Sequence, residues 1–136
     1  MWNQLKTKAR SDSMVKGKET FGGRVRRKRM EKQITLRKFA DMIDVSPTYI
    51  SQIERDEFKP PVEDKIREIA RVLGENEDEM LALADRVPSD LPSIIQKHPK
   101  EVATFLRTAK GFSREDWENL TKNIAKNPSG KGGKDQ

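Results

Sequence analysis

The chain has 136 residues, of which 33% are hydrophobic and 37% charged, and its formal net charge is +6. This composition predicts a helix-rich protein with one compact domain or two small ones. The sequence contains no cysteine, which excludes disulfides, thiolate zinc sites and cysteine nucleophiles; no apolar run approaches the roughly 18 residues of a membrane span, so we expect a cytoplasmic protein without a membrane partner.

The N-terminal stretch over residues 1–20 is rich in Lys, Ser and Thr and shows no sustained periodicity. Segments of this kind bury too little apolar surface to fold by themselves. We therefore predict a flexible basic arm over residues 1–20.

Apolar periodicity predicts a domain of five helices over residues 21–86. Pro60 and Pro61 cannot lie in a helix interior, so they separate the third helix from the fourth. Gly74 ends the fourth helix, and the NEDE that follows shortly after it places a cap and acids at the start of the fifth. The expected core consists of apolar residues at helical spacing: Phe21, Val25, Phe39, Ile43, Val45, Ile50, Ile53, Ile66, Ile69, Leu73, Met80 and Leu81.

Residues 34–55 are the most informative stretch, because they predict two short helices joined by a tight turn. Ser46 supplies an N-cap and Pro47 a preset φ, so the second helix should begin at Pro47. Asp44 ends the first helix where the backbone usually becomes left-handed, a conformation that Asp tolerates. One face of the second helix is apolar, and the other carries uncharged polar side chains suited to the edges of DNA bases: Thr48, Tyr49, Ser51 and Gln52.

The stretch from about Phe21 to about Ala84 resembles the lambda-repressor-like (Cro/CI, XRE) family of helix-turn-helix transcriptional regulators. Five elements in the family's order carry the resemblance: a basic first helix, the motif itself, a loop and two further helices. Asp44 and Asp56 stand where the family often has glycine, and both can adopt positive φ. The resemblance implies an all-α fold, with a five-helix DNA-binding domain followed by a short C-terminal helical segment.

The resemblance also implies contacts that hold the motif and fix it on DNA. An arginine of the first helix pairs with a glutamate that ends the recognition helix in this family, and the matching structural pair is Arg29 and Glu54. Leu36 stands where phage repressors often have a phosphate-binding glutamine, so Thr35 or Arg37 replaces that contact. The implied phosphate-binding residues are Thr35, Arg37, Arg55 and Lys59.

Base-reading roles are carried over to the second helix of the motif in the same way. Gln52 has an amide that can bond adenine bidentately, and Thr48 has a methyl group for thymine or a hydroxyl for either kind of base. Pro47 has no donor and shapes the helix start, while Tyr49 either meets the DNA backbone or packs on the first helix. The implied set is Pro47, Thr48, Tyr49, Ser51 and Gln52.

Positive charge gathers in the half of the chain that carries the motif: residues 21–60 hold ten Lys and Arg against six Asp and Glu, whereas residues 61–110 hold eight against ten. A basic half suits attraction to phosphates, although a basic helix alone fits a solvated surface equally well. Next to the motif we favour a double-stranded DNA partner. Entry of the basic arm into a minor groove stays open, with incidental lysines as the favoured interpretation.

Residues 88–126 predict two or three short helices with apolar stripes. Ser113 followed by Asp116 resembles a capping box. Fewer than about 40 residues rarely form an independent core, so these helices should pack on the first domain, closing its core in a monomer, or, as we favour, on a second copy. We assign the segment to dimerisation or partner binding through Phe105, Leu106, Phe112, Trp117, Leu120 and Ile124, and we predict a flexible tail over residues 127–136.

The predicted function is a homodimeric repressor that reads a two-fold symmetric operator, because one helix-turn-helix reads few base pairs and occlusion of an operator requires only binding. The alternative is an antitoxin-like or peptidase-paired autoregulator whose C-terminal half binds a partner protein. An enzyme is disfavoured, because the single histidine, His98, has no cysteine or Gly-rich phosphate loop to work with. We expect no catalytic residue, no metal and no cofactor.

Overall fold

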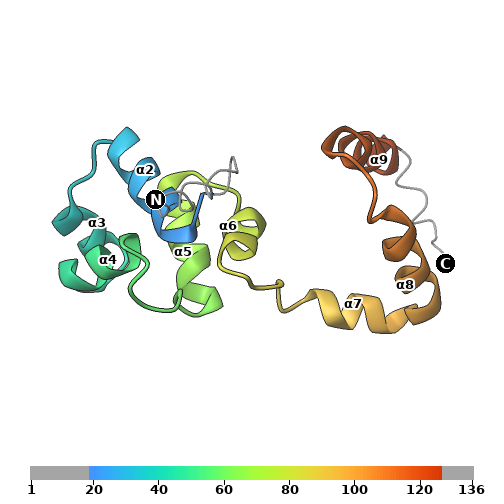
Figure 1. The fold of residues 1–136 in the computed structure, drawn as a ribbon, viewed down its shortest axis with the longest axis horizontal. Coiled ribbons are helices and arrows are strands. Elements are labelled where there is room, and N and C mark those ends of the chain that lie inside the picture. The colour runs from blue at the N-terminus through green and yellow to red at the C-terminus, as the bar shows by residue number, and fades with distance from the viewer. Residues whose placement is uncertain (1–18, 127–136) are drawn as a thin grey trace, which may run out of the picture. The chain divides into compact units, whose positions relative to one another are not determined.

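The computed structural model describes residues 19–126, and all regular secondary structure within that range is α-helical (Figure 1). The prediction of an all-α fold is confirmed. No helix in this range is long and apolar enough to cross a membrane. The predicted tail and nearly all of the predicted arm lie outside the described residues. The helices are α2 (Phe21–Glu31), α3 (Leu36–Met42), α4 (Pro47–Glu54), α5 (Glu63–Leu73), α6 (Glu77–Leu83), α7 (Leu91–Lys97), α8 (Pro99–Ala109) and α9 (Arg114–Lys126).

The chain divides into two compact units, the first ending at Ser89 and the second beginning at Asp90. In the first unit, α2 packs against α4 and α5, α3 packs against α4, and α5 packs against α6 (Figure 1). In the second unit, α7 packs against α8. The two helices of the predicted motif, α3 and α4, are therefore direct neighbours within the first unit.

Side-chain caps begin most helices of the first unit. Each cap accepts a hydrogen bond from the backbone N–H three residues later, at 2.9–3.0 Å. Such bonds satisfy N–H groups of the first turn that have no partner inside the helix. The capping residues are Thr20 for α2, Thr35 for α3, Ser46 for α4 and Asn76 for α6. The predicted start of α4 at Pro47 is confirmed.

Left-handed backbone follows all five helices of the first unit, at Gln33, Asp44, Asp56, Gly74 and Asp85. Asp44, in the turn between α3 and α4, has a φ of 58°, and Asp56, just after α4, has a φ of 56°. The expectation that aspartate adopts positive φ at these two positions is confirmed. Gly74 ends α5 with a φ of 71°, as predicted.

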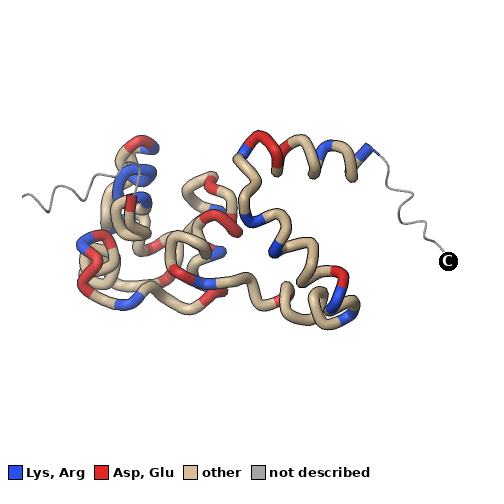
Figure 2. The backbone as a smooth tube through the Cα atoms, turned by 45° about the vertical axis from the view of Figure 1, so that its right-hand side comes forward, with Lys and Arg blue, Asp and Glu red and all other residues tan. Residues whose placement is uncertain are grey.

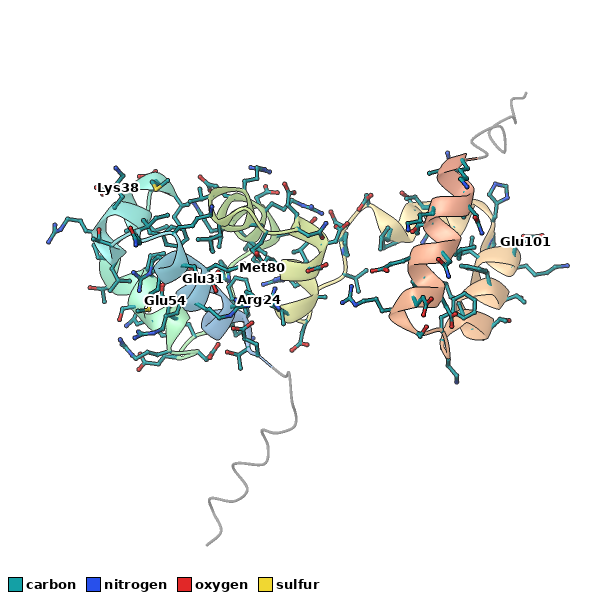
Figure 3. All side chains as sticks on the ribbon, turned by 90° about the horizontal axis from the view of Figure 1, so that it is seen from above. Arg24, Glu31, Lys38, Glu54, Met80 and Glu101 are labelled. Carbon is teal, nitrogen blue, oxygen red and sulfur yellow. The ribbon has the colours of Figure 1, made fainter. Side chains whose placement is uncertain are left out.

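The core of the first unit forms where its five helices meet. Every predicted core residue is buried except Val45, which lies in the turn before α4 and is only partly buried against the others. Ala40 and Ala70 are buried in addition. The small side chain of Ala40 lets α3 and α4 approach each other. Met80 of α6, labelled in Figure 3, is fully enclosed.

Candidate nucleic-acid interface

Helix α4 has one buried and one accessible face. The buried face consists of Ile50, Ile53 and Glu54, which are at most 7% exposed. The accessible face consists of Thr48, which is exposed, and of Ser51 and Gln52, which are half-buried. These three positions are spaced i, i+3 and i+4, so they share one side of the helix. The accessible face thus offers hydroxyl and amide groups that both donate and accept hydrogen bonds.

The two other predicted base-reading residues lie in the first turn of α4. Pro47 occupies the first helical position and is exposed. Tyr49 is partly buried and packs against the core. This partial burial favours the packing arrangement over a contact with the DNA backbone for Tyr49.

Arg29 and Glu54 join α2 to the end of α4 (Glu54 is labelled in Figure 3). The Arg29 guanidinium donates from Nε to Glu54 Oε2 at 2.7 Å and from Nη2 to Oε1 at 3.0 Å. Its Nη1 donates to the carbonyl oxygen of Ile34 at 2.8 Å. The two side chains are only 10% and 3% exposed, so the charges are buried and compensated by bidentate geometry. The pair fixes the end of α4 against α2 and against the segment that precedes α3.

Asp56 makes a second connection between α4 and α2, which sequence reasoning missed because it treated Asp56 only as a turn residue. Its Oδ1 accepts a hydrogen bond from the Gly22 N–H at 3.1 Å, and its Oδ2 accepts one from Thr20 Oγ1 at 2.8 Å. A Cβ on Gly22 would collide with the carbonyl oxygens of Ile53 and Glu54. The first turn of α2 therefore lies directly on the end of α4, and a carboxylate is placed at the positive end of α2.

A match to a known family covers the part of the chain that contains helices α2 to α6. Residues 22–86 match the model of a family described as a helix-turn-helix domain. Residues 22–86 are a helix-turn-helix domain. The resemblance inferred from the sequence is confirmed, and α3 and α4 are the two helices of the motif. A comparison with curated proteins found no match.

Three solved structures are similar to this helix-turn-helix protein. SinR, the master regulator for biofilm formation, was solved in complex with DNA; it is 27% identical, covers 46% of this chain and 98% of its own, and has a TM-score of 0.43. The clp gene regulator ClgR from Corynebacterium glutamicum is 31% identical over 50% of this chain and 87% of its own, with a TM-score of 0.42. A further ClgR structure is 26% identical over 68% of this chain and 93% of its own, with a TM-score of 0.43.

The predicted phosphate-binding residues lie at the start of α3 and just after the end of α4. Thr35 caps α3 through its hydroxyl oxygen, which leaves its O–H free to donate. Arg37 and Lys59 are exposed and form no ion pair with another described residue. Arg55 differs from them, because its Nε lies 2.8 Å from Oε2 of Glu57. Among the described residues, Arg37 and Lys59 are therefore unpaired cations, whereas Arg55 already has a carboxylate partner.

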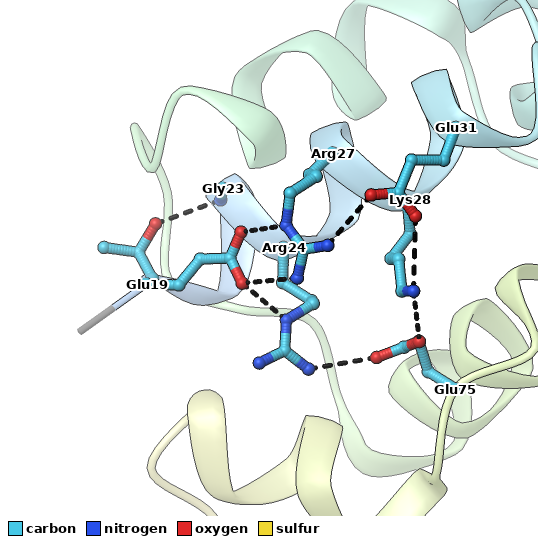
Figure 4. Close-up of polar contacts among 8 residues, drawn as sticks. Glu19, Gly23, Arg24, Arg27, Lys28, Glu31 and Glu75 are labelled. Atoms are coloured by element: carbon cyan, nitrogen blue, oxygen red, sulfur yellow. Dashed lines mark hydrogen bonds and ion pairs between the residues drawn. The ribbon is translucent and has the colours of Figure 1, made fainter. Parts of the chain in front are cut away.

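The basic helix α2 of the helix-turn-helix domain is largely neutralised by acids (Figure 4). Arg24 and Arg27 bond the carboxylate of Glu19 at 2.6 and 2.7 Å, and Lys28 lies 3.2 Å from a carboxylate oxygen of Glu75. The hydrogen bond from Arg27 is the main reason that the pKa of Glu19 falls to about 2. Figure 2 shows acidic residues interspersed among the cations of this unit. A count of Lys and Arg along the sequence therefore overestimates the positive charge that α2 has available for DNA phosphates.

The second unit carries a cluster of three aromatic rings. The Trp117 ring lies edge-on to Phe105 at a centroid distance of 6.0 Å and to Phe112 at 5.3 Å. The capping box at the start of α9 is confirmed, since Ser113 and Asp116 exchange hydrogen bonds of 3.0 and 3.1 Å. The contact between Phe105 and Trp117 joins α8 to α9, and the box fixes the start of α9.

Much of the apolar surface of the second unit nevertheless remains accessible. Among the described residues from 90 to 126, Ala109 alone is buried. The predicted dimerisation residues are either partly buried, as for Phe112 and Leu120, or exposed, as for Phe105 (41%), Leu106 (44%), Trp117 (37%) and Ile124 (61%). This unit therefore has a cluster of apolar side chains without a closed core beneath it.

Proposed function

We propose that this chain is a sequence-specific regulator of transcription that binds double-stranded DNA and places α4 in the major groove. The observation that supports this function best is the accessible polar face of α4, whose opposite face is anchored in the core. The major groove is about 12 Å wide and admits one α-helix. A helix anchored through Arg29 and Glu54 presents its outer side chains in a constant direction, which sequence reading requires.

The base-reading group is Thr48, Ser51 and Gln52, with Pro47 and Tyr49 shaping the start of the helix. The Gln52 amide can donate to N7 and accept from N6 of adenine. Hydroxyls of Thr48 and Ser51 bond either kind of base, and the Thr48 methyl group fits against thymine. Discrimination between bases therefore depends mainly on Gln52, because its amide donor and acceptor are the most directional groups of the three side chains.

Phosphate contacts come from residues on either side of this face. Arg37 and Lys59 are exposed cations without intramolecular ion pairs among the described residues. Thr35, two residues before Arg37, supplies a hydroxyl donor. Contacts to phosphates fix register and orientation and carry no base information. Such contacts make affinity depend on salt, because each neutralised phosphate releases counterions.

Gln52→Ala and Lys59→Ala are expected to give different binding signatures. Gln52→Ala should cost about 1–3 kcal/mol on the preferred duplex and relax the sequence preference at one base pair. Lys59→Ala should weaken binding to all duplexes alike and reduce the salt slope by about one unit. Titrations of selected and random duplexes at several salt concentrations measure both effects. Equal losses on both duplexes for Gln52→Ala would contradict base reading.

We further propose that the protein acts as a homodimer through its second unit and represses by occupying a two-fold symmetric operator. The exposed apolar surface of Phe105, Leu106, Trp117 and Ile124 supports this assembly, because aromatic and aliphatic side chains gain most from exclusion of water. A dimer places two recognition helices about 34 Å apart, one turn of DNA. Occlusion of a promoter then needs no contact beyond DNA binding.

Ile124→Lys is expected to shift the protein from dimer to monomer. A lysine ammonium within an apolar interface loses hydration without gaining a partner, whereas Ile124 is already 61% exposed in one copy, so the fold should persist. Sedimentation velocity of the full chain measures the change. Val87→Lys is the matched control, because Val87 is 69% exposed in the first unit and should leave the assembly unchanged. A wild-type chain that sediments as a monomer at micromolar concentration would refute the dimer.

The same apolar surface supports a second candidate function, in which the second unit binds a partner protein and the first unit autoregulates the genes of both. This antitoxin-like or peptidase-paired arrangement uses the surface of α8 and α9 for a different protein rather than for a second copy. Purification from the native cell separates the two functions. A second protein in stoichiometric amount would favour the autoregulator, and its absence would favour the simple repressor.

A further inference from the structure

Arg55 is the C-cap residue of α4 and continues the line of its accessible polar face at the end of the helix. It follows Thr48 by seven residues, Ser51 by four and Gln52 by three, so all four positions lie on one side of the helix. The helical backbone continues to this point, because the Arg55 N–H donates to the Ser51 carbonyl oxygen at 3.1 Å. The Arg55 guanidinium also turns back along the helix, with Nη1 donating to Ser51 Oγ. Arg55 is thus a neighbour of the base-reading residues rather than of the flanking cations.

Glu57 occupies one edge of the Arg55 guanidinium and leaves another edge free. Arg55 donates from Nε to Glu57 Oε2 at 2.8 Å and from Nη2 to Oε1 at 3.0 Å. A guanidinium has five N–H donors in a planar fork, so the end formed by Nη1 and Nη2 still carries hydrogens beyond those used by Glu57 and Ser51. This end is the one that can meet two acceptors side by side.

The backbone of Glu57 is itself held to α4. Its N–H donates to the carbonyl oxygen of Gln52 at 3.0 Å, directly after the left-handed turn at Asp56. The hydrogen bond from Arg55 lowers the pKa of Glu57, which keeps the carboxylate ionised. Because the side chains of Arg55 and Glu57 are 53% and 48% exposed, their pair contributes little to stability. Its main effect is to orient the guanidinium.

A phosphate contact does not explain this arrangement. Attraction to phosphates depends on net positive charge, and Glu57 offsets the charge of Arg55. Recognition of guanine needs direction instead, because two parallel N–H groups must meet O6 and N7 in the plane of the base. An oriented, charge-compensated guanidinium on the polar face of α4 meets the second requirement.

We propose that Arg55 is a base-reading residue that donates both Nη groups to O6 and N7 of one guanine in each half-site, and that Glu57 is the positioning residue that orients it. This inference rests on the proposed function of the chain as a DNA-binding regulator. It changes the role that the sequence implied for Arg55, from a phosphate contact to a specificity determinant. Lys59, four residues further along the chain, keeps the phosphate role.

The test is selection of binding sites from randomised duplexes with the full chain. The wild type should select guanine at one position that Arg55→Lys no longer selects, with discrimination there falling about 10-fold or more. Arg55→Lys keeps the positive charge, so a role as a phosphate contact would survive it. Glu57→Gln should weaken the same position alone, and Glu57→Asp should restore part of the preference. Lys59→Ala is the matched control and should leave every preference intact.

The opposite results are equally distinct. If Arg55→Lys and Glu57→Gln leave the selected motif unchanged, Arg55 does not read a base and the proposal is overturned, while the proposed function stands. A wild-type chain that selects no motif overturns the proposed function and this inference together. The exposed positions of both residues predict unchanged melting temperatures for these variants, which circular dichroism checks.

Discussion

Glu54→Ala is expected to lower the free energy of unfolding of the helix-turn-helix domain by about 3–5 kcal/mol. The substitution removes the partner of a guanidinium that is buried between α2 and α4, so the Arg29 charge stays in a site closed to water. The Arg29 guanidinium donates three hydrogen bonds, and two of them go to the Glu54 carboxylate. Urea denaturation followed by circular dichroism measures the loss.

A double substitution separates the stranded charge from lost packing. Arg29→Met together with Glu54→Leu removes both charges and keeps most of the volume, and such replacements of buried pairs are often neutral or stabilising. The double variant should therefore recover most of the stability that Glu54→Ala loses. If it is as unstable as the single variant, packing rather than the unpaired charge governs this junction. Arg55→Lys, at an exposed position, provides the control for a nearby change outside the buried pair.

Gly22→Ala is expected to destabilise the same domain by about 2–4 kcal/mol, because overpacking also displaces Asp56 from its hydrogen bond with the backbone N–H of residue 22. The added Cβ would lie 2.9 Å from the carbonyl oxygen of Glu54 and 2.6 Å from Asp56 Oδ1. Both groups belong to the end of α4, so α2 must move away from the recognition helix or bend. Thermal unfolding measures the effect on stability, and operator affinity should fall in parallel as α4 loses its support.

Gly111→Ala is the matched control for this substitution. A Cβ at Gly111 would meet no heavy atom within 4 Å, so the change alters only the conformational freedom of the chain. Its melting temperature should equal or slightly exceed that of the wild type. A Gly22→Ala variant as stable as the Gly111→Ala variant would show that α2 does not rest on the end of α4.

The two junctions have one consequence for recognition. Two pairs of residues connect α2 to the end of α4: Arg29 with Glu54, and Gly22 with Asp56. Neither pair belongs to the accessible polar face. Substitutions at these positions should reduce affinity for all sequences through the placement of α4, whereas substitutions on the polar face should change which sequence is preferred. We therefore expect affinity and preference to depend on opposite sides of one short helix.

The amino-acid sequence by itself determined the local features of the fold. Ser46 and Pro47 start α4, Asp44 turns the chain before it, and Ser113 with Asp116 caps α9, as predicted. Each of these signals works through bonds between residues at most a few positions apart, so the residue types alone specify them. Helical periodicity predicted the core residues in the same way. Val45 is only partly buried because it lies in a turn, where residue spacing does not assign side chains to one face.

Only the tertiary structure decided the contacts that join distant segments. Asp56 bonds Gly22 across 34 residues and Arg24 bonds Glu75 across 51, and no spacing rule predicts which acid meets which donor at such separations. The resemblance to a family supplied the pair of Arg29 and Glu54, but not the neutralisation of α2. Burial of the apolar faces of the helices brings these groups together during folding. The position of each helix end then determines which polar groups become partners.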